Sequence, residues 1–168
     1  QSVLAVMVPR AERNSEACNI AKQEELSKLK EFNTYKILED KGQDRITTTW
    51  VLTEKAETIR ARLTCKGFQE EDNFPTDSPT IQKSSIRMIL ALATTSDWRI
   101  KAIDIKSAFL QGDKLDREVF VKPPKEANLT NKLWRLKKCL YGLKDASRQW
   151  YLRLKTTLKK HGFQKSIY

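Results

Sequence analysis

The sequence predicts an α+β fold, because helix-periodic and strand-like segments are interleaved without a regular strand–helix–strand repeat. Its 168 residues leave room for one ordinary domain, and 39% hydrophobic with 32% charged residues is the balance of a globular protein. Five Gly and five Pro exclude fibrous and low-complexity classes. We expect one domain over residues 14–168, preceded by a connector remnant at residues 1–13, which lack periodicity.

The first predicted element is a helix over residues 16–32, which Asn14 or Ser15 can cap. Glu25 interrupts the apolar stripe along one side of this helix. The stripe consists of Cys18, Ala21, Leu29 and Phe32.

A hairpin follows, with strands at residues 46–55 and 58–66. In the second strand apolar and polar residues alternate strictly, so that Arg60, Arg62 and Lys66 share one face. Such a row of cations can bind phosphates. It can equally be the soluble outer face of a hairpin.

The middle of the chain mixes turns, a helix and two strands. Residues 73–81 are rich in turn formers, and Ser84 can cap a helix over residues 85–95. Residues 99–105 predict a largely buried strand, and residues 118–121 a short one that two prolines end. The predicted core face of the helix is Ile86, Ile89, Leu90 and Ala93.

The last predicted element is a helix over residues 146–160, capped by Asp145 and ended by Gly162. Its apolar face consists of Ala146, Trp150, Tyr151, Leu154 and Leu158.

The formal net charge is +11, and residues 132–165 account for +10 of it, with eleven Lys or Arg and a single acid, Asp145. A basic block of this kind suits phosphate backbones or an anionic lipid surface. The commoner outcome is a solvated helix face.

Cysteine usage and hydropathy exclude several classes of protein. Three widely spaced Cys and one His make neither a zinc site nor a disulfide framework, which favours a reducing compartment. The longest apolar run, residues 3–8, is far shorter than the roughly 20 residues of a membrane-spanning helix. With no secretory signal pattern, we expect an intracellular protein, in a cytoplasmic particle or the nucleus, without membrane contact.

Asp104 is the acidic residue that stands out, because it lies inside the apolar segment 99–105. An ionised carboxylate there is costly unless it is paired or binds a metal. Mg²⁺ prefers such hard oxygen ligands. The alternatives are a carboxylate at the solvent end of a strand, or one paired with a neighbouring Lys.

Four strings occur in an order and at spacings that resemble the reverse transcriptase of Ty1/copia-type retrotransposon Pol polyproteins. They are IRARLTCKGFQ, IKAIDIKSAFLQGD, VFVKPP and LWRLKKCLYGLKDASRQWY, and the resemblance runs from about Glu16 to the last residue. It implies a right-hand polymerase fold, of which this chain would hold the fingers and the N-terminal part of the palm. The implied reaction is nucleotide transfer to a DNA 3′ end, with an RNA or DNA template, a primer, dNTPs and the remainder of the Pol polyprotein as partners.

The resemblance also assigns roles to residues. Asp104 matches the first catalytic, metal-binding carboxylate for two Mg²⁺ ions, and the backbone carbonyl of Ile105 matches a second metal ligand. Phe109 matches the aromatic ring that lies under the nucleotide sugar and excludes a 2′-hydroxyl. The other implied nucleotide-binding residues are Arg62, Ser107, Ala108, Tyr141 and Gly142. The implied nucleic-acid-binding residues are Arg60, Lys66, Lys144, Arg148, Arg153 and Lys155.

The sequence departs from the family pattern in two places. Asp-Ala-Ser-Arg at residues 145–148 replaces the usual Gln-Ala-Pro-Arg, and no Tyr-x-Asp-Asp motif is present. We therefore expect a partial domain that is inactive alone. The alternatives are a non-enzymatic nucleic-acid-binding relic or domesticated module, and an incomplete gene product without an independent role.

Overall fold

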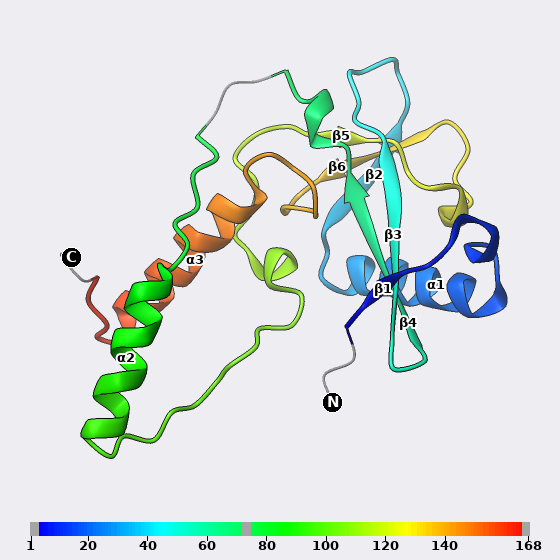
Figure 1. The fold of residues 1–168 in the computed structure, drawn as a ribbon. Helices are drawn as coiled ribbons and strands as arrows, with labels where there is room; N and C mark the ends of the chain where they lie inside the picture. Colours follow the sequence, from blue (N-terminus) through cyan, green and yellow to red (C-terminus); the bar gives the residue numbers. More distant parts are fainter. Residues whose placement is uncertain (1–3, 72–74, 166–168) are drawn as a thin grey trace.

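The computed structural model describes residues 4–71 and 75–165 (Figure 1). Within these residues the chain forms three α-helices and two small three-stranded sheets, which confirms the predicted α+β class. None of the described helices is long and apolar enough to cross a membrane. Four short 3₁₀ helices connect the larger elements: η1 (Arg10–Glu12), η2 (Gly67–Gln69), η3 (Ala108–Gln111) and η4 (Lys125–Ala127).

The first sheet is antiparallel, in the order β1 (Val6–Met7), β3 (Thr48–Lys55) and β4 (Thr58–Cys65). The predicted hairpin is therefore confirmed, and its two turn residues, Ala56 and Glu57, both have positive φ. Two such residues give a turn whose twist matches that of the flanking strands. β1 was not predicted, because a two-residue strand leaves no periodic pattern.

The second sheet is also antiparallel, in the order β2 (Tyr35–Glu39), β6 (Lys132–Leu136) and β5 (Phe120–Val121). Of these strands only β5 was predicted. Tyr35 and Trp134 stack face to face, with ring centroids 3.9 Å apart. This sheet borders the main core, whose largest fully buried members are Leu29, Leu63, Leu110, Val121, Trp134 and Leu140.

α1 (Glu16–Glu31) agrees with the first predicted helix, and Ser15 caps it by accepting a hydrogen bond from the Cys18 amide. Cys18 and Ala21 pack against Leu52 and Ala61 of the first sheet. Packing on one face of the sheet fixes the helix beside β4 (Figure 1).

α2 (Lys83–Thr95) forms where a helix was predicted, but two details of the prediction were wrong. Ser84 lies inside the helix, and Gln82 occupies the N-cap position without a side-chain cap bond. The predicted core face is largely exposed, and only Ala93 of α2 is buried. Figure 1 shows the reason, because α2 lies apart from both sheets.

Residues 99–105 do not form the predicted buried strand. The segment is irregular, and the Ile103 side chain is 88% exposed. A strand needs a backbone partner for its N–H and C=O groups, and no described strand pairs with this segment. Asp104 is consequently exposed rather than embedded in apolar surroundings.

α3 (Ala146–Lys160) agrees with the last predicted helix. Asp145 occupies the N-cap position, but its carboxylate makes no cap bond and binds Arg117 instead. Gly162, at φ +84°, follows the helix and ends it as predicted. Of the predicted apolar face only Ala146 is fully buried, because α3 lies at the edge of the molecule.

Candidate nucleotide-binding cleft

A cleft of about 800 Å³ lies between α1, the edge strand β4 and the loop at residues 104–109. This cleft gathers most of the residues that the resemblance singles out, although they come from three separate strings. The predicted residues in its wall are Arg60, Arg62, Asp104, Ile105, Ser107, Ala108, Phe109 and Tyr141.

Two aromatic rings and a guanidinium form one corner of the cleft. Phe109 and Tyr141 meet edge to face, with centroids 5.3 Å apart, and the Arg62 guanidinium lies 5.9 Å from the centre of the Tyr141 ring. Burial raises the pKa of the Tyr141 phenol, and the negative charge of Glu25 raises it further, while Arg62 opposes the change. The phenol therefore stays neutral and can donate or accept a hydrogen bond.

The backbone of residues 141–142 is bound directly to β4. The Cys65 amide donates to the Tyr141 carbonyl at 2.7 Å, and Gly142 has φ +87°. A Cβ on Gly142 would collide with the Cys65 carbonyl oxygen. Gly142 is thus required by this close approach; it lies beside the cleft and not in its wall.

The loop at residues 104–109 is held from its C-terminal side. Leu110 is fully buried, and Gln111 Nε2 donates to the Lys106 carbonyl at 2.7 Å. Ser107 has φ +52°, which is uncommon for a residue with a side chain. These contacts fix the C-terminal end of the loop, and the loop places Asp104 and Ser107 in the cleft wall.

The cleft wall also contains residues that were not predicted as site residues, among them an ion pair on α1. Glu25 and Lys28 of α1 face this space, and Lys28 Nζ lies 2.9 Å from Glu25 Oε2. The signal in the sequence was the interruption of the apolar stripe, since a charged residue on the buried side of a helix needs a reason to be there.

Comparison with known proteins identifies the family of the chain. The family model described as "Reverse transcriptase (RNA-dependent DNA polymerase)" matches residues 32–168. The chain belongs to this reverse transcriptase family. It is 35% identical over 159 residues to the "Retrovirus-related Pol polyprotein from transposon TNT 1-94" of Nicotiana tabacum, covering 87% of this chain and 12% of that protein.

A second relative lies in another plant. The chain is 36% identical over 129 residues to the Pol polyprotein from transposon RE2 of Arabidopsis thaliana, covering 70% of this chain and 9% of the relative. The chain thus spans about a tenth of the length of the curated relatives that it matches. No solved structure matches it significantly.

The predicted nucleic-acid-binding cations of this reverse transcriptase chain lie mostly outside the cleft. Lys144 Nζ donates to the Glu70 carbonyl, Arg148 pairs with Asp77 at 2.7 Å, and Arg153 pairs with Asp113 at 3.0 Å. Lys155 lies over the Tyr151 ring, and Lys66 follows the end of β4.

Intramolecular pairing reduces the charge that the basic segment can offer to a partner. Four of its eleven cations pair with acids outside the segment, and the formal +10 overstates the free charge accordingly. The four are Lys132, Arg135, Arg148 and Arg153.

A largely buried ion cluster next to residues 144–145 was not predicted. Arg117 Nη2 lies 2.7 Å from Glu70 Oε1 and 2.8 Å from Asp145 Oδ1. Glu70 Oε2 also accepts from the Lys144 amide at 2.8 Å. The departure from the family pattern at Asp145 therefore has a structural partner in Arg117, and the cluster ties residues 144–145 to the segment after β4.

The described residues form no metal site of their own. Asp104 and Ile105 lie in the cleft wall, and no group of three or more His, Cys, Asp or Glu side chains in the described part of the chain could hold a metal ion. Mg²⁺ usually takes one or two carboxylates with phosphate oxygens and water. Asp104 fits one of those positions.

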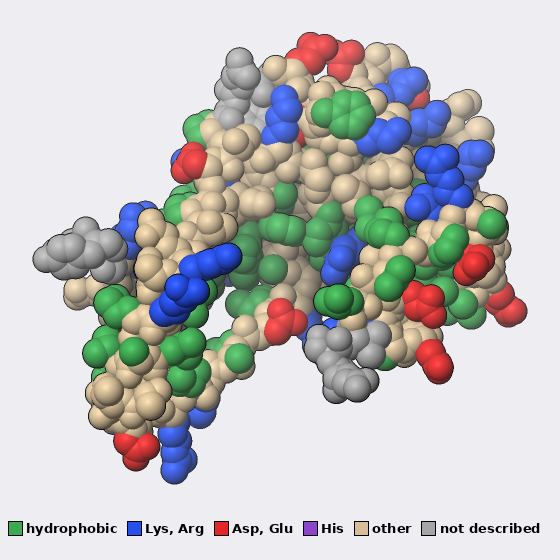
Figure 2. Space-filling view, viewed as in Figure 1, with side chains coloured by type: hydrophobic (Ala, Val, Ile, Leu, Met, Phe, Trp, Pro, Cys, Tyr) green, Lys and Arg blue, Asp and Glu red, His purple; other side chains and the backbone are tan. Residues whose placement is uncertain are grey.

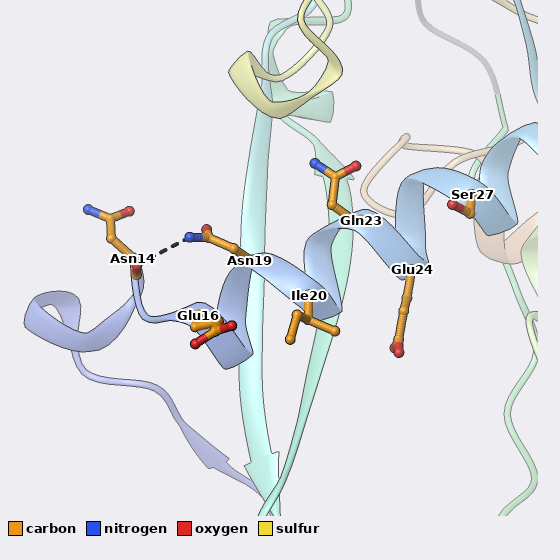
Figure 3. A pocket seen from close by; sticks show the side chains of 7 residues that line it. All are labelled: Asn14, Glu16, Asn19, Ile20, Gln23, Glu24 and Ser27. Atoms are coloured by element: carbon orange, nitrogen blue, oxygen red, sulfur yellow. Dashed lines mark hydrogen bonds between the residues drawn. The ribbon is translucent and has the colours of Figure 1, made fainter.

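A second hollow, of about 660 Å³, lies on the outer side of α1 (Figure 3). Its wall includes Ile20 and Gln23, and Asn19 Nδ2 donates to the Asn14 carbonyl at 3.2 Å. None of the predicted site residues lines it. It is the solvent-facing side of the helix.

Proposed function

We propose that this chain is the fingers and the N-terminal part of the palm of a right-hand reverse transcriptase. In the complete protein it would act in RNA-directed DNA synthesis, with a primed RNA or DNA template, dNTPs and the remainder of the Pol polyprotein. The observation that supports this best is the convergence of eight predicted residues from three strings on one cleft.

The cleft has the chemistry that a nucleoside triphosphate requires. Arg60, Arg62 and Lys106 supply positive charge in its wall. Templated phosphoryl transfer depends mainly on positioning and electrostatic stabilisation, so that fixed cations beside the phosphates contribute directly. Phe109, held against Tyr141, presents a ring where a 2′-hydroxyl would clash with it.

The metal requirement explains why the chain is expected to be inactive alone. Two Mg²⁺ ions, when bound, would stabilise the charge on the attacking and leaving oxygens. Asp104 and the Ile105 carbonyl are the residues of this chain that would hold them. One carboxylate is too few for two ions, so the remaining ligands must come from outside the described residues.

Primer extension tests the assignment of Asp104. The 168-residue chain should extend no primer with Mg²⁺, whereas the chain lengthened by its native continuation through the paired carboxylates should do so. In the longer protein Asp104→Asn should lower extension by about three orders of magnitude or more, since it removes a metal ligand. Asp116→Asn, at an exposed position outside the cleft, is the matched control and should retain activity.

Two results would contradict this assignment. One is robust polymerisation by the 168-residue chain, and the other is full activity of the longer Asp104→Asn protein. Because Asp104 is exposed, the substitution should leave the thermal melt unchanged, which separates lost chemistry from lost folding.

Sugar selection tests the role of Phe109 in the same longer protein. Phe109→Ala should lower the ratio of dNTP to rNTP efficiency, because it removes a clash against the ribonucleotide. Steady-state incorporation of dNTPs and rNTPs measures this ratio. Equal loss of both efficiencies would show that Phe109 serves only to pack against Tyr141 and the core.

A further inference from the structure

Glu25 is a buried carboxylate, and one of its two oxygens accepts no hydrogen bond from the described residues. Its side chain is 3% exposed, and Oε2 accepts from Lys28 Nζ at 2.9 Å. Oε1 has no hydrogen-bond partner among the described residues. An unsatisfied buried acceptor costs free energy, so its presence in the wall of a cleft indicates a partner that arrives with the ligand.

The charges of the cleft differ from wall to wall. α1 contributes the carboxylates of Glu24 and Glu25 and the cation of Lys28, the loop contributes one acid and one cation, and β4 contributes two arginines and no acid. Phosphates are therefore expected on the side of β4, where two arginines lie without an acid. The side of α1 suits a part of the ligand that carries a hydrogen-bond donor.

The class of donor follows from the proposed function, on which this inference rests. A polymerase copies every sequence, so a contact made at each step cannot depend on a particular base edge. The phosphates and deoxyriboses inside a DNA strand have no hydrogen-bond donor. Sugar hydroxyls are the sequence-independent donors that remain: the 2′-hydroxyl of an RNA template, or the 3′-hydroxyl of an incoming nucleotide.

We propose that Glu25 accepts a hydrogen bond from a sugar hydroxyl of the nucleic acid or nucleotide bound in this cleft. Lys28 holds Oε2, whereas Oε1 has no partner and is closed off from solvent, so that the side chain would turn towards the cleft to meet the hydroxyl. Hydrogen bonds to an ionised acceptor are stronger than those between neutral groups, so the carboxylate should contribute measurably to affinity.

The experiment uses the 168-residue chain and four ligands. Fluorescence anisotropy would measure its affinity for single-stranded RNA and DNA of the same sequence, and calorimetry its affinity for dATP and 2′,3′-dideoxy-ATP with Mg²⁺. The variants are Glu25→Gln, which keeps the shape, and Glu25→Met, which removes the acceptor. Glu24→Gln removes the same charge from the same wall and is the matched control.

The expected result is a loss of preference for the hydroxyl-bearing ligand. Glu25→Met should lower the ratio of RNA to DNA affinity by about tenfold if the template supplies the hydroxyl, and Glu25→Gln should lower it by less. If the incoming nucleotide supplies it, the ratio of dATP to dideoxy-ATP affinity should fall instead. Glu24→Gln should leave both ratios unchanged, and DNA affinity should not weaken in any variant.

Several results would overturn the proposal. Ratios that stay at the wild-type value in both Glu25 variants, or that shift equally in Glu24→Gln, would show that no hydroxyl reaches Glu25. Unfolding of both variants would identify Glu25 as a purely structural ion-pair partner of Lys28. A wild-type chain that binds none of the four ligands would instead refute the proposed function, and this inference with it.

Discussion

Two regions of the chain are similarly rich in apolar residues but differ in how deeply these residues are buried. They are the hairpin of β3 and β4 and the segment at residues 83–105. Leu52 and Leu63 in the hairpin are fully buried, whereas Ile89 and Ile103 in the second segment are largely exposed. Figure 2 shows the hydrophobic side chains that gather around α2 on the surface. An apolar pattern thus indicates which side chains can be buried. Whether they are buried depends on the presence of another element that packs against them.

The hairpin contains its own partner. β4 follows β3 after a two-residue turn, and α1 covers one face of both strands. Residues 99–105 meet no strand among the described residues, and α2 buries only Ala93. An exposed apolar face of this kind is typical of an interaction surface.

The largest expected effect is a direct test of this contrast. Leu63→Ala should lower the free energy of unfolding by about 2–5 kcal/mol, because it opens a cavity in the main core. Ile103→Ala should change it by less than about 0.5 kcal/mol, because the side chain is exposed. Urea denaturation followed by tryptophan fluorescence measures both. Comparable losses in the two variants would mean that residues 99–105 are packed in solution.

Local patterns predicted the elements whose determinants are close together in the sequence. α1, the β3–β4 hairpin and α3 each have periodicity, caps or turn residues within the segment itself. β2 and β6 pair across about a hundred residues, so the partner of each strand is not encoded nearby. β1 is only two residues long, which is too short for a strand pattern in the sequence.

The same distinction applies to the site. The resemblance predicted the residues of the cleft that belong to its strings, such as Arg62 and Tyr141, and the structure brings them together. It could not predict Glu25, which lies outside these strings, or the pairing of Arg117 with Glu70 and Asp145. Such contacts join segments that are far apart in the sequence, and charge alone does not reveal which acid meets which base.

A smaller expected effect is the pH dependence of stability that the two buried thiols of the main core, Cys65 and Cys139, produce. Burial raises the pKa of Cys65 and that of Cys139 to about 12, and the negative charges of Glu70 and Asp145 add to it. Above pH 9 the unfolded chain loses thiol protons that the folded chain keeps. Stability should therefore be unaffected by these thiols below about pH 8 and fall as the pH rises from 9 towards 12, by about 1 kcal/mol per thiol between pH 9 and 10.

The measurement is the free energy of unfolding between pH 7 and 10.5. The double variant Cys65→Ala, Cys139→Ala is the control: it should be less stable at pH 7 because of the lost volume, but its stability should fall less steeply with pH. Parallel pH profiles for the two proteins would contradict the assignment, since Lys and Tyr ionisation is common to both.

The smallest expected effect compares two serines that the sequence marked as helix caps, Ser15 as an alternative to Asn14 and Ser84 alone. Ser15→Ala removes the acceptor of the Cys18 amide at the start of α1 and should lower the free energy of unfolding by about 1 kcal/mol. Ser84→Ala replaces a residue inside the exposed helix α2 by the best helix former, and should leave stability unchanged or raise it by a few tenths of a kcal/mol. Paired denaturation curves resolve the sign. An equal loss in Ser84→Ala would show that α2 begins at residue 85 and that its first turn depends on this side chain, as the sequence alone had predicted.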